Sequence, residues 1–291
     1  MYNVTIGDDN MINGSTKLAC LIGQPVEHSF SPNIHNCLFE KYNINSKYMC
    51  FDVDKDSLKD AIMAIKALKI NAANVTIPHK VDIMNYLDDI DTNARLIGAV
   101  NTIKNDNGKL IGYNTDGIGF VNSVLDKGYE IKDKKVMILG AGGAARSIAV
   151  EIASNNAKFI EIRNRSIDKA QNITNTIKEN FKSIVKTGDI SISKEDLENI
   201  DILINTTSLG MSPDVDKLPI DKTIKLDKEI LVCDIVYNPK ETRFLKWAKE
   251  NNLDTLGGID MLINQALEAF YIWTGVRPDR EYLSQVEELR F

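Results

Sequence analysis

The sequence has no apolar run approaching the roughly 18 residues of a membrane-spanning helix, which excludes an ordinary transmembrane helix. It begins MYNVTIGDDNMINGS, a polar, acidic segment without the basic and apolar parts of a secretory signal peptide. Cysteine is scarce, and Cys20, Cys37, Cys50 and Cys233 form no CxxC pair, which argues against a disulfide framework in a chain this long. We therefore expect reduced thiols in a cytoplasmic protein with no membrane partner.

Histidine and excess basic charge are also lacking. His28, His35 and His79 form neither an HExxH pattern nor a Cys/His cluster, so we expect no metal site. The 35 Lys and Arg residues are outnumbered by 41 Asp and Glu, and the net charge of −6 argues against nucleic acid as a partner. At about 100–200 residues per domain, a chain of 291 residues predicts two domains.

The first part of the chain predicts strands, helices and one hairpin. Strands are expected at 18–22 and 71–77, and the helical period of apolar residues predicts a helix within 55–68. Ser31-Pro32 predicts the start of another helix, with Ser31 as its N-cap.

Asn107-Gly108 is a strong signal for a two-residue hairpin turn between apolar runs on either side. In that register the opposed residue numbers sum to 215, so Asp116 faces Ala99. Asn101 is then its diagonal neighbour, roughly 7–8 Å away. The hairpin would bring these two polar residues together at its open end.

After residue 116 the pattern changes to alternating strands and helices, which predicts a parallel, doubly wound sheet. The strands are expected at 134–139, 158–162, 200–204 and 230–235, and the helices at 117–127, 146–154, 167–180, from 258 to about 273 and at the C-terminus.

A dinucleotide fingerprint lies after the strand at 134–139. Gly140, Gly142 and Ala145 fit G-x-G-x-x-A, in which the first Gly allows a tight turn and the second lets the backbone approach a pyrophosphate. The following helix N-terminus offers free N–H groups to the phosphates. The expected cofactor contacts here are Gly140, Ala141, Gly142, Gly143 and Ala144.

The residues after the second strand favour NADP(H). An NAD site usually has Asp or Glu there to hold the ribose 2′-hydroxyl, whereas this chain has Asn164, Arg165 and Ser166. Arg165 suits a 2′-phosphate, with its two neighbours as hydrogen-bond partners. Glu161 lies earlier, within the strand. The alternative is that Arg163 and Arg165 form a solvated basic loop.

Longer motifs closely resemble the shikimate dehydrogenase family over roughly residues 18–275. They are GQPVEHSFSPNIHN at 23–36, NVTIPHK at 74–80, GAVNT at 98–102, GYNTDG at 112–117, NTTSLGM at 205–211, DIVYNP at 234–239 and GGIDMLINQ at 257–265.

The resemblance implies an α/β protein of two domains. Residues 1–116 and 257–291 would form a mixed-sheet domain that binds shikimate, and 117–256 an inserted doubly wound Rossmann domain that binds NADP. The implied reaction is the reversible reduction of 3-dehydroshikimate to shikimate by NADPH, in chorismate and aromatic amino acid biosynthesis. The implied partner is this small-molecule substrate, and the protein would be a monomer or homodimer.

The resemblance makes Lys80 and Asp116 catalytic. A Lys ammonium can give a proton to the alkoxide left by hydride transfer, and the amine can remove it in reverse. Asp116 would orient that ammonium and hold a substrate hydroxyl. Without the surrounding motif, Lys80 would be read as a surface lysine that caps a helix C-terminus or lies in solution. Asp116 could be the N-cap of the next helix, and it could serve both purposes.

The remaining substrate contacts are also implied by the resemblance. Ser29 and Ser31 would bind the substrate carboxylate, with Tyr237 closing over it, and Thr76 and Asn101 would hold ring hydroxyls. Asn74 is more simply a structural strand residue, and Ser31 could act only as a helix cap.

Met261 and Gln265 are four residues apart, so they share one helix face. The resemblance places Gln265 on substrate hydroxyls and Met261 near the nicotinamide, although Met261 could simply be core. It also assigns Thr206, Ile235 and Gly258 to the cofactor.

Two other functions stay open. A dual-specificity quinate/shikimate dehydrogenase that uses NAD would be expected to carry an acidic residue just after the Asn-Arg pair, where this chain has Ser166 and Ile167. A non-catalytic, ligand-sensing regulator could keep both pockets, but it would not need Lys80 and Asp116.

Overall fold

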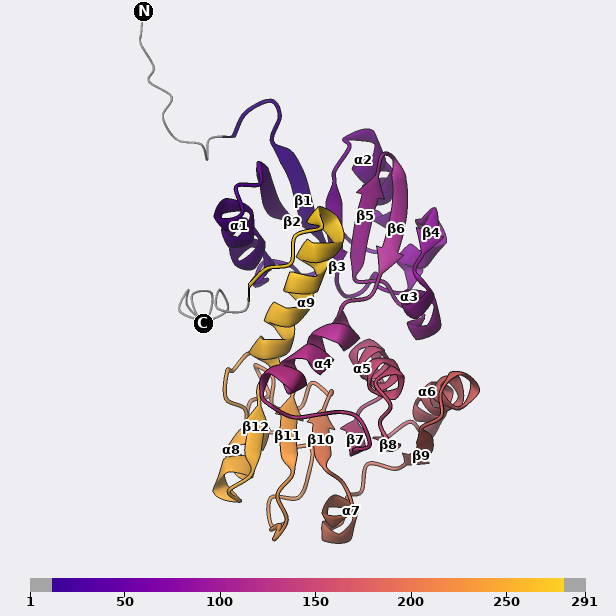
Figure 1. Cartoon of the computed structure of the whole chain (residues 1–291), viewed down its shortest axis with the longest axis vertical. Helices are drawn as coiled ribbons and strands as arrows, with labels where there is room; N and C mark the ends of the chain where they lie inside the picture. Colours follow the sequence, from indigo (N-terminus) through magenta and orange to yellow (C-terminus); the bar gives the residue numbers. More distant parts are fainter. Residues whose placement is uncertain (1–11, 280–291) are drawn as a thin grey trace, which may run out of the picture. The chain divides into compact units, whose positions relative to one another are not determined.

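The computed structural model describes residues 12–279, which divide into two compact units (Figure 1). The first unit contains the chain up to Ile90, Val100–Tyr113 and the chain from Phe270. The second contains Asp91–Ala99 and Asn114–Ala269. No helix among residues 12–279 is long and apolar enough to cross a membrane.

The first unit is built on a mixed six-stranded sheet in the order β2-β1-β3-β5-β6-β4. Strand β1 pairs with β2 and β3 in parallel, whereas β5 is antiparallel to both of its neighbours. The predicted mixed sheet is therefore confirmed. The strands are β1 (Lys17–Gly23), β2 (Ser46–Asp52), β3 (Ala72–Val75), β4 (Asp89–Ile90), β5 (Thr102–Asp106) and β6 (Lys109–Tyr113).

Two helices, α1 (Ser31–Lys41) and α2 (Leu58–Ala67), and a 3₁₀ turn, η1 (Asp82–Tyr86), accompany this sheet. The prediction that Ser31 is the N-cap of α1 is wrong, because Phe30 occupies that position and Ser31 is the first helical residue. The Ser29 hydroxyl accepts the Ser31 N–H at 3.3 Å, so Ser29 bonds to the start of this helix.

The predicted hairpin register is confirmed, since pairs run from Asp106–Lys109 to Thr102–Tyr113. Both turn residues, Asn107 and Gly108, have positive φ, as a type I′ turn requires.

The extension of this register to Ala99 and Asp116 is wrong, because the strands end first and Asp116 begins helix α4 (Asp116–Asp126). The cause is Asn114. Its side-chain amide donates to the Ala99 carbonyl at 3.0 Å, and its amide oxygen accepts the Asp116 N–H at 3.1 Å. These two bonds turn the chain from the strand into the helix.

The second unit contains a fully parallel sheet whose order, read from one edge, is β9-β8-β7-β10-β11-β12. In chain order this is 3-2-1-4-5-6, the doubly wound arrangement that binds dinucleotides where the order reverses. The predicted Rossmann sheet is confirmed, with edge strands β9 and β12 that the sequence did not predict. The strands are β7 (Lys135–Leu139), β8 (Phe159–Arg163), β9 (Ile184–Gly188), β10 (Ile202–Asn205), β11 (Leu231–Asp234) and β12 (Asp254–Leu256).

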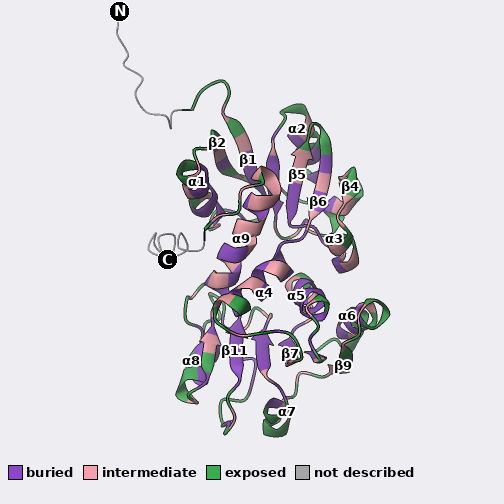
Figure 2. Cartoon of the chain, viewed as in Figure 1, coloured by how far each residue is buried: buried purple, intermediate pink, exposed green. Residues whose placement is uncertain are grey.

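Helices cover both faces of this sheet, so alternate strand residues enter different cores (Figure 2). Val136 and Ile138 pack with residues of α4, α5 and α6, whereas Met137 and Leu139 pack with residues of α7 and α8. The helices of this unit are α3 (Thr92–Ile97), α4, α5 (Gly143–Ser154), α6 (Ile167–Asn180), α7 (Lys194–Glu198), α8 (Arg243–Glu250) and α9 (Gly258–Thr274) up to Ala269.

The domain boundaries predicted from the sequence differ from these units. The segments 91–99, 114–116 and 257–269 were assigned to the substrate domain, but their contacts place them in the second unit. Close packing accounts for the difference: Gly119 of α4 lies against the backbone of Gln265 in α9, and Ile97 and Ala99 pack with Val150 of α5. The predicted C-terminal helix and most of the predicted N-terminal arm lie outside the described residues.

Candidate functional site

The loop after β7 has the geometry of a phosphate-binding turn. Gly140 has φ +112, and a Cβ on it would lie 2.5 Å from Thr206 Oγ1, so only glycine fits. A Cβ on Gly142 or Gly143 would meet nothing within 4 Å, so the loop surface is open. Because α5 begins at Gly143, its first N–H groups and its dipole favour an anion at this loop.

A pocket of about 460 Å³ adjoins this loop and is lined by Ala141, Gly142, Asn164, Arg165, Ser166 and Lys169. The structure therefore brings together five of the predicted cofactor residues. Lys169 was missed, although its place three residues after Ser166, in the first turn of α6, could have indicated it. Within residues 12–279, neither Arg165 nor Lys169 forms an ion pair with a protein carboxylate, so both charges remain available to an anion.

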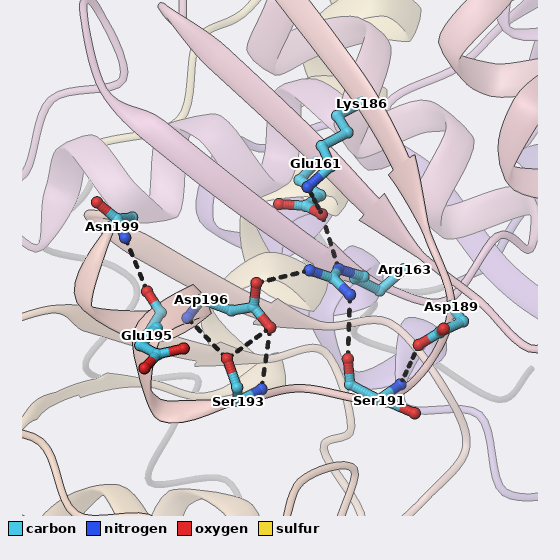
Figure 3. Close-up of polar contacts among 9 residues, drawn as sticks. All are labelled: Glu161, Arg163, Lys186, Asp189, Ser191, Ser193, Glu195, Asp196 and Asn199. Carbon is cyan, nitrogen blue, oxygen red and sulfur yellow. Dashed lines mark hydrogen bonds and ion pairs between the residues drawn. The ribbon is translucent and has the colours of Figure 1, made fainter.

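The alternative of a solvated basic loop is wrong for Arg163. Its side chain is only 10% exposed, and its Nε lies 2.8 Å from Glu161 Oε1 (Figure 3). Glu161, the nearest acidic residue in this strand, is therefore engaged by a cation.

The other predicted cofactor residues follow the carboxyl ends of β10, β11 and β12. Thr206 donates through both its N–H and its hydroxyl to the Leu139 carbonyl, at 2.9 and 2.7 Å. Gly258 lies against the Ile235 carbonyl, where any side chain would overlap it. Met261 is 9% exposed and belongs to the hydrophobic core against which Ile235 packs. Met261 is therefore at least a core residue of this unit.

In the first unit, a buried polar network joins two predicted substrate residues, Ser31 and Asn101. The Tyr48 hydroxyl donates to Asn74 Oδ1 at 2.8 Å and is hydrogen-bonded to the Ser31 side chain. The Asn74 amide donates to the Asn101 carbonyl at 3.2 Å and to Thr102 Oγ1 at 3.1 Å, and that hydroxyl donates to Asn101 Oδ1 at 2.9 Å. Asn74 is thus the structural residue that the sequence suggested, and the network orients Ser31 and Asn101.

Burial keeps this network neutral. It raises the pKa of the Tyr48 phenol well above its ordinary value and lowers the pKa of His35 to about 3. The neutral His35 ring stacks on Tyr48, with ring centroids 4.6 Å apart.

Lys80 and Thr76 flank the turn that follows β3. The Thr76 N–H donates to the Ile22 carbonyl at 3.0 Å, and the half-buried Lys80 accepts the Val100 N–H at 2.7 Å through its own carbonyl. Lys80 is thereby anchored one residue from Asn101 in the same unit.

Asp116, Gln265 and Tyr237 belong to the second unit. Thr115 is the N-cap of α4, so the predicted cap position of Asp116 is wrong by one residue, and its carboxylate lies in the first turn, where the helix dipole favours it. Asp116 is 7% exposed. The Thr115 hydroxyl contacts Gln265 Oε1 at 3.4 Å, and Tyr237 is 37% exposed.

Three family models match separate parts of the chain. A shikimate dehydrogenase substrate binding domain matches residues 21–103, shikimate / quinate 5-dehydrogenase matches 122–243, and a shikimate 5′-dehydrogenase C-terminal domain matches 258–286.

The shikimate dehydrogenase (NADP(+)) of Methanococcus aeolicus is 47% identical over 269 residues, which are 92% of this chain and 96% of that protein. The chain belongs to the shikimate dehydrogenase family. A second relative, the shikimate dehydrogenase (NADP(+)) of Methanocaldococcus jannaschii, is 49% identical over 94% of this chain and 96% of its own. A crystal structure of a shikimate dehydrogenase in complex with NADP+ matches with a TM-score of 0.90 and 45% identity, over 97% of this chain and 99% of that one.

Membership of the shikimate dehydrogenase family confirms the resemblance found in the motifs. No cluster of three or more potential metal ligands was found among residues 12–279. The four cysteines, all of which the structure describes, are free thiols.

Asp234, in the DIVYNP motif of this shikimate dehydrogenase fold, is expected to make stability depend on pH. Burial raises its pKa to about 6, despite hydrogen bonds from Thr242 Oγ1 at 2.6 Å, the Val236 N–H and the Asn205 amide. Because the pKa of an unfolded Asp is about 3.9, the folded state binds this proton more tightly. Its contribution is therefore present below about pH 4 and is lost as pH rises to about 6.

Asp234→Asn should remove this dependence. We expect the free energy of unfolding of the parent to fall relative to the variant by about 2–3 kcal/mol between pH 4 and 7, as measured by urea denaturation. Parallel pH curves for the two proteins would contradict the assignment.

Proposed function

We propose that this chain is an NADP-dependent shikimate dehydrogenase, which reduces 3-dehydroshikimate reversibly to shikimate in aromatic amino acid biosynthesis. The observation that carries the cofactor choice is the pocket beside Gly142, where Arg165 and Lys169 offer two cations and Glu161 is ion-paired elsewhere. A 2′-phosphate is the group that such a pair of cations recognises. The names of the relatives, which specify NADP, support the same choice.

When bound, the reduced nicotinamide supplies a hydride to the C3 carbonyl carbon of 3-dehydroshikimate. The carbonyl oxygen becomes an alkoxide as the new C–H bond forms, and the Lys80 ammonium gives it a proton. Lys80 then regains a proton from solvent. Asp116 holds the substrate hydroxyl next to the reacting carbon, and in the reverse direction the Lys80 amine removes the proton.

The other polar residues fix the substrate. Ser29 and Ser31 donate hydrogen bonds to the carboxylate and Tyr237 closes over it, while Thr76, Asn101 and Gln265 bind ring hydroxyls. Met261 and Ile235 provide an apolar surface for the nicotinamide, and Thr206 and Gly258 border it.

We also propose that the protein works in the cytoplasm as a monomer or homodimer. Its four free cysteines are consistent with a reducing compartment, in which NADPH is available.

The direct test is turnover by the purified protein, followed by the absorbance of NADPH, with shikimate or quinate as substrate and NADP or NAD as cofactor. We expect activity confined largely to shikimate with NADP. Comparable rates for quinate with NAD would support the dual-specificity alternative, and absence of turnover with every pair would support a non-catalytic regulator.

The substitution Gly119→Ala tests whether Gln265 binds the substrate. A methyl group on Gly119 would lie 2.6 Å from the backbone nitrogen of Gln265 and 2.7 Å from its Cβ, so Gly119→Ala must displace α9. We expect a loss of about 1–3 kcal/mol in the free energy of unfolding and a raised KM for shikimate. Asn122→Ala, on the same helix, is the control. An unchanged KM in a destabilised Gly119→Ala protein would argue against substrate binding by Gln265.

A further inference from the structure

Arg163 occupies the junction between the two loops that contribute the cofactor pocket. Its carbonyl accepts the N–H of Gly140, the first residue of the phosphate loop, at 2.8 Å. The next residue, Asn164, is the first pocket residue of the second loop, and its N–H donates to the Gly188 carbonyl at 3.2 Å. A change in the charge around Arg163 therefore changes the electrostatic potential close to both loops.

The Arg163 guanidinium binds three separate segments beneath this junction (Figure 3). Its Nε lies 2.8 Å from Glu161 Oε1 in β8, one terminal nitrogen donates to the Ser191 carbonyl at 3.0 Å, and the other donates to Asp196 Oδ1 at 2.9 Å. A side chain on Gly188 would overlap this guanidinium, with its Cβ 2.6 Å from Arg163 Cδ. The packing at the end of β9 is thus built around this one side chain.

The cluster contains two carboxylates, which Arg163 compensates. Although burial opposes ionisation, hydrogen bonds from Ser193 and the Arg163 charge keep the pKa of Asp196 below its ordinary value, so Asp196 is ionised. Glu161, whose side chain is 6% exposed, has one further cation, Lys186, at 3.5 Å, and that lysine is 59% exposed. Without Arg163, the cluster would carry net negative charge with only a solvent-screened lysine to offset it.

That charge would lie close to the cofactor pocket. Glu161 precedes Asn164 by three residues, about 10 Å along an extended strand. At an effective dielectric constant of about 20, one unit charge at that distance changes the binding of an anion by about tenfold. The effect is largest for a ligand that carries a phosphate at this end of the pocket, because the Coulomb energy falls with distance.

We propose that Arg163 is a specificity-determining residue for the cofactor, which permits the 2′-phosphate of NADP by neutralising Glu161 behind the pocket. Arg163 itself does not line the pocket, so it acts through Glu161. Arg165 and Lys169 then remain free for the phosphate instead of being drawn to an uncompensated carboxylate. The proposal rests on the proposed function, because it concerns how an NADP site is kept selective.

The test measures the affinity of the full-length protein for two cofactor fragments by calorimetry. Adenosine 2′,5′-bisphosphate carries the discriminating phosphate, and adenosine 5′-monophosphate lacks it. In Arg163→Met we expect about tenfold weaker binding of the bisphosphate and less than about twofold change for the monophosphate. In Glu161→Gln/Arg163→Met the bisphosphate affinity should return to within about threefold of the parent, because the carboxylate charge is gone.

Two further variants complete the test, one that can replace Arg163→Met and one that serves as a control. An unpaired buried carboxylate is strongly destabilising, so Arg163→Met can fail to fold. Arg163→Lys, which keeps the compensating charge but not the planar fork, should then bind the bisphosphate within about threefold of the parent, as should the double variant. Lys228→Met removes an ion pair to Asp201 at the opposite ends of the strands and should change neither affinity.

Weakening of both ligands to the same extent in Arg163→Met, or a tenfold loss that persists in the double variant, would overturn the proposal in favour of a purely structural role. If the unaltered protein binds the two fragments equally, the cofactor choice under the proposed function fails as well. If it prefers the bisphosphate and Arg163→Met binds the bisphosphate as tightly as the parent, only the role of Arg163 is refuted.

Discussion

Lys80→Ala should lower kcat for shikimate oxidation by about 10²–10⁴-fold while leaving the fold intact. The loss is expected because Lys80 is the only lysine or arginine of the NVTIPHK segment, and the buried His79 is bonded to the Val53 carbonyl at 2.7 Å. The Lys80 backbone makes its hydrogen bond to Val100 through the carbonyl, which alanine retains, so the polypeptide there should not move. Steady-state kinetics at saturating NADP measure the change in kcat, and thermal unfolding checks the fold.

A matched control separates this effect from loss of surface charge. Lys109 lies in the hairpin of the same unit, 53% exposed and paired with Asp89 at 3.0 Å, and Lys109→Ala should keep the parental kcat. Addition of methylammonium should restore part of the activity of Lys80→Ala, since a small amine can replace the missing acid. A Lys80→Ala protein with near-parental kcat would show that another group performs the proton transfer.

The phosphate loop could be predicted from the sequence because its chemistry is local. The glycine pattern at 140–143 and the polar run at 164–166 can each be recognised within a few residues of sequence, although the turn at Gly140 also packs against the distant Thr206. The hairpin register was predictable for the same reason, since two turn residues determine it. Its extension to Asp116 failed because Asn114 ends the strand through side-chain bonds that an alternating pattern does not reveal.

The burial of Arg163 could not be predicted from the sequence because two of its three partners are remote. Ser191 and Asp196 lie about 30 residues later, around the short helix α7, which has no amphipathic period long enough to predict. A basic residue next to two other polar residues therefore looked solvated. The helix α8, in contrast, could have been predicted from the sequence. Thr242 caps it, and the buried residues Phe244, Trp247 and Ala248 follow the helical spacing.

The buried network around Tyr48 also depends on distant segments. Ser31, Asn74 and Asn101 come from three motifs, and it is a tyrosine outside all of them that connects the first two. The sequence motifs named the residues that would touch a ligand. They did not reveal how those residues are held, because that requires the register of β2 against β1 and of β3 against β5.

Arg165→Ala should raise the KM for NADPH by about 10–100-fold and the KM for NADH by less than about threefold. The range corresponds to loss of one charge-assisted bond to a phosphate, about 1.5–3 kcal/mol. Arg165 is exposed at the pocket and has no competing ion pair within the described part of the chain, so its charge is available in full to the cofactor. Initial rates with each cofactor at saturating shikimate measure the two KM values.

Lys169→Ala should act in the same direction, and Lys182→Ala, an exposed cation of the same unit outside the pocket, should change neither KM. The difference between the cofactors should shrink as salt is added, because an exposed cation is screened over about 10 Å at 0.1 M ionic strength. Equal increases in both KM values would mean that Arg165 supports the adenosine or the loop and does not recognise the 2′-phosphate. NADP selectivity would then have to come from Lys169 and from the neutralised Glu161 alone.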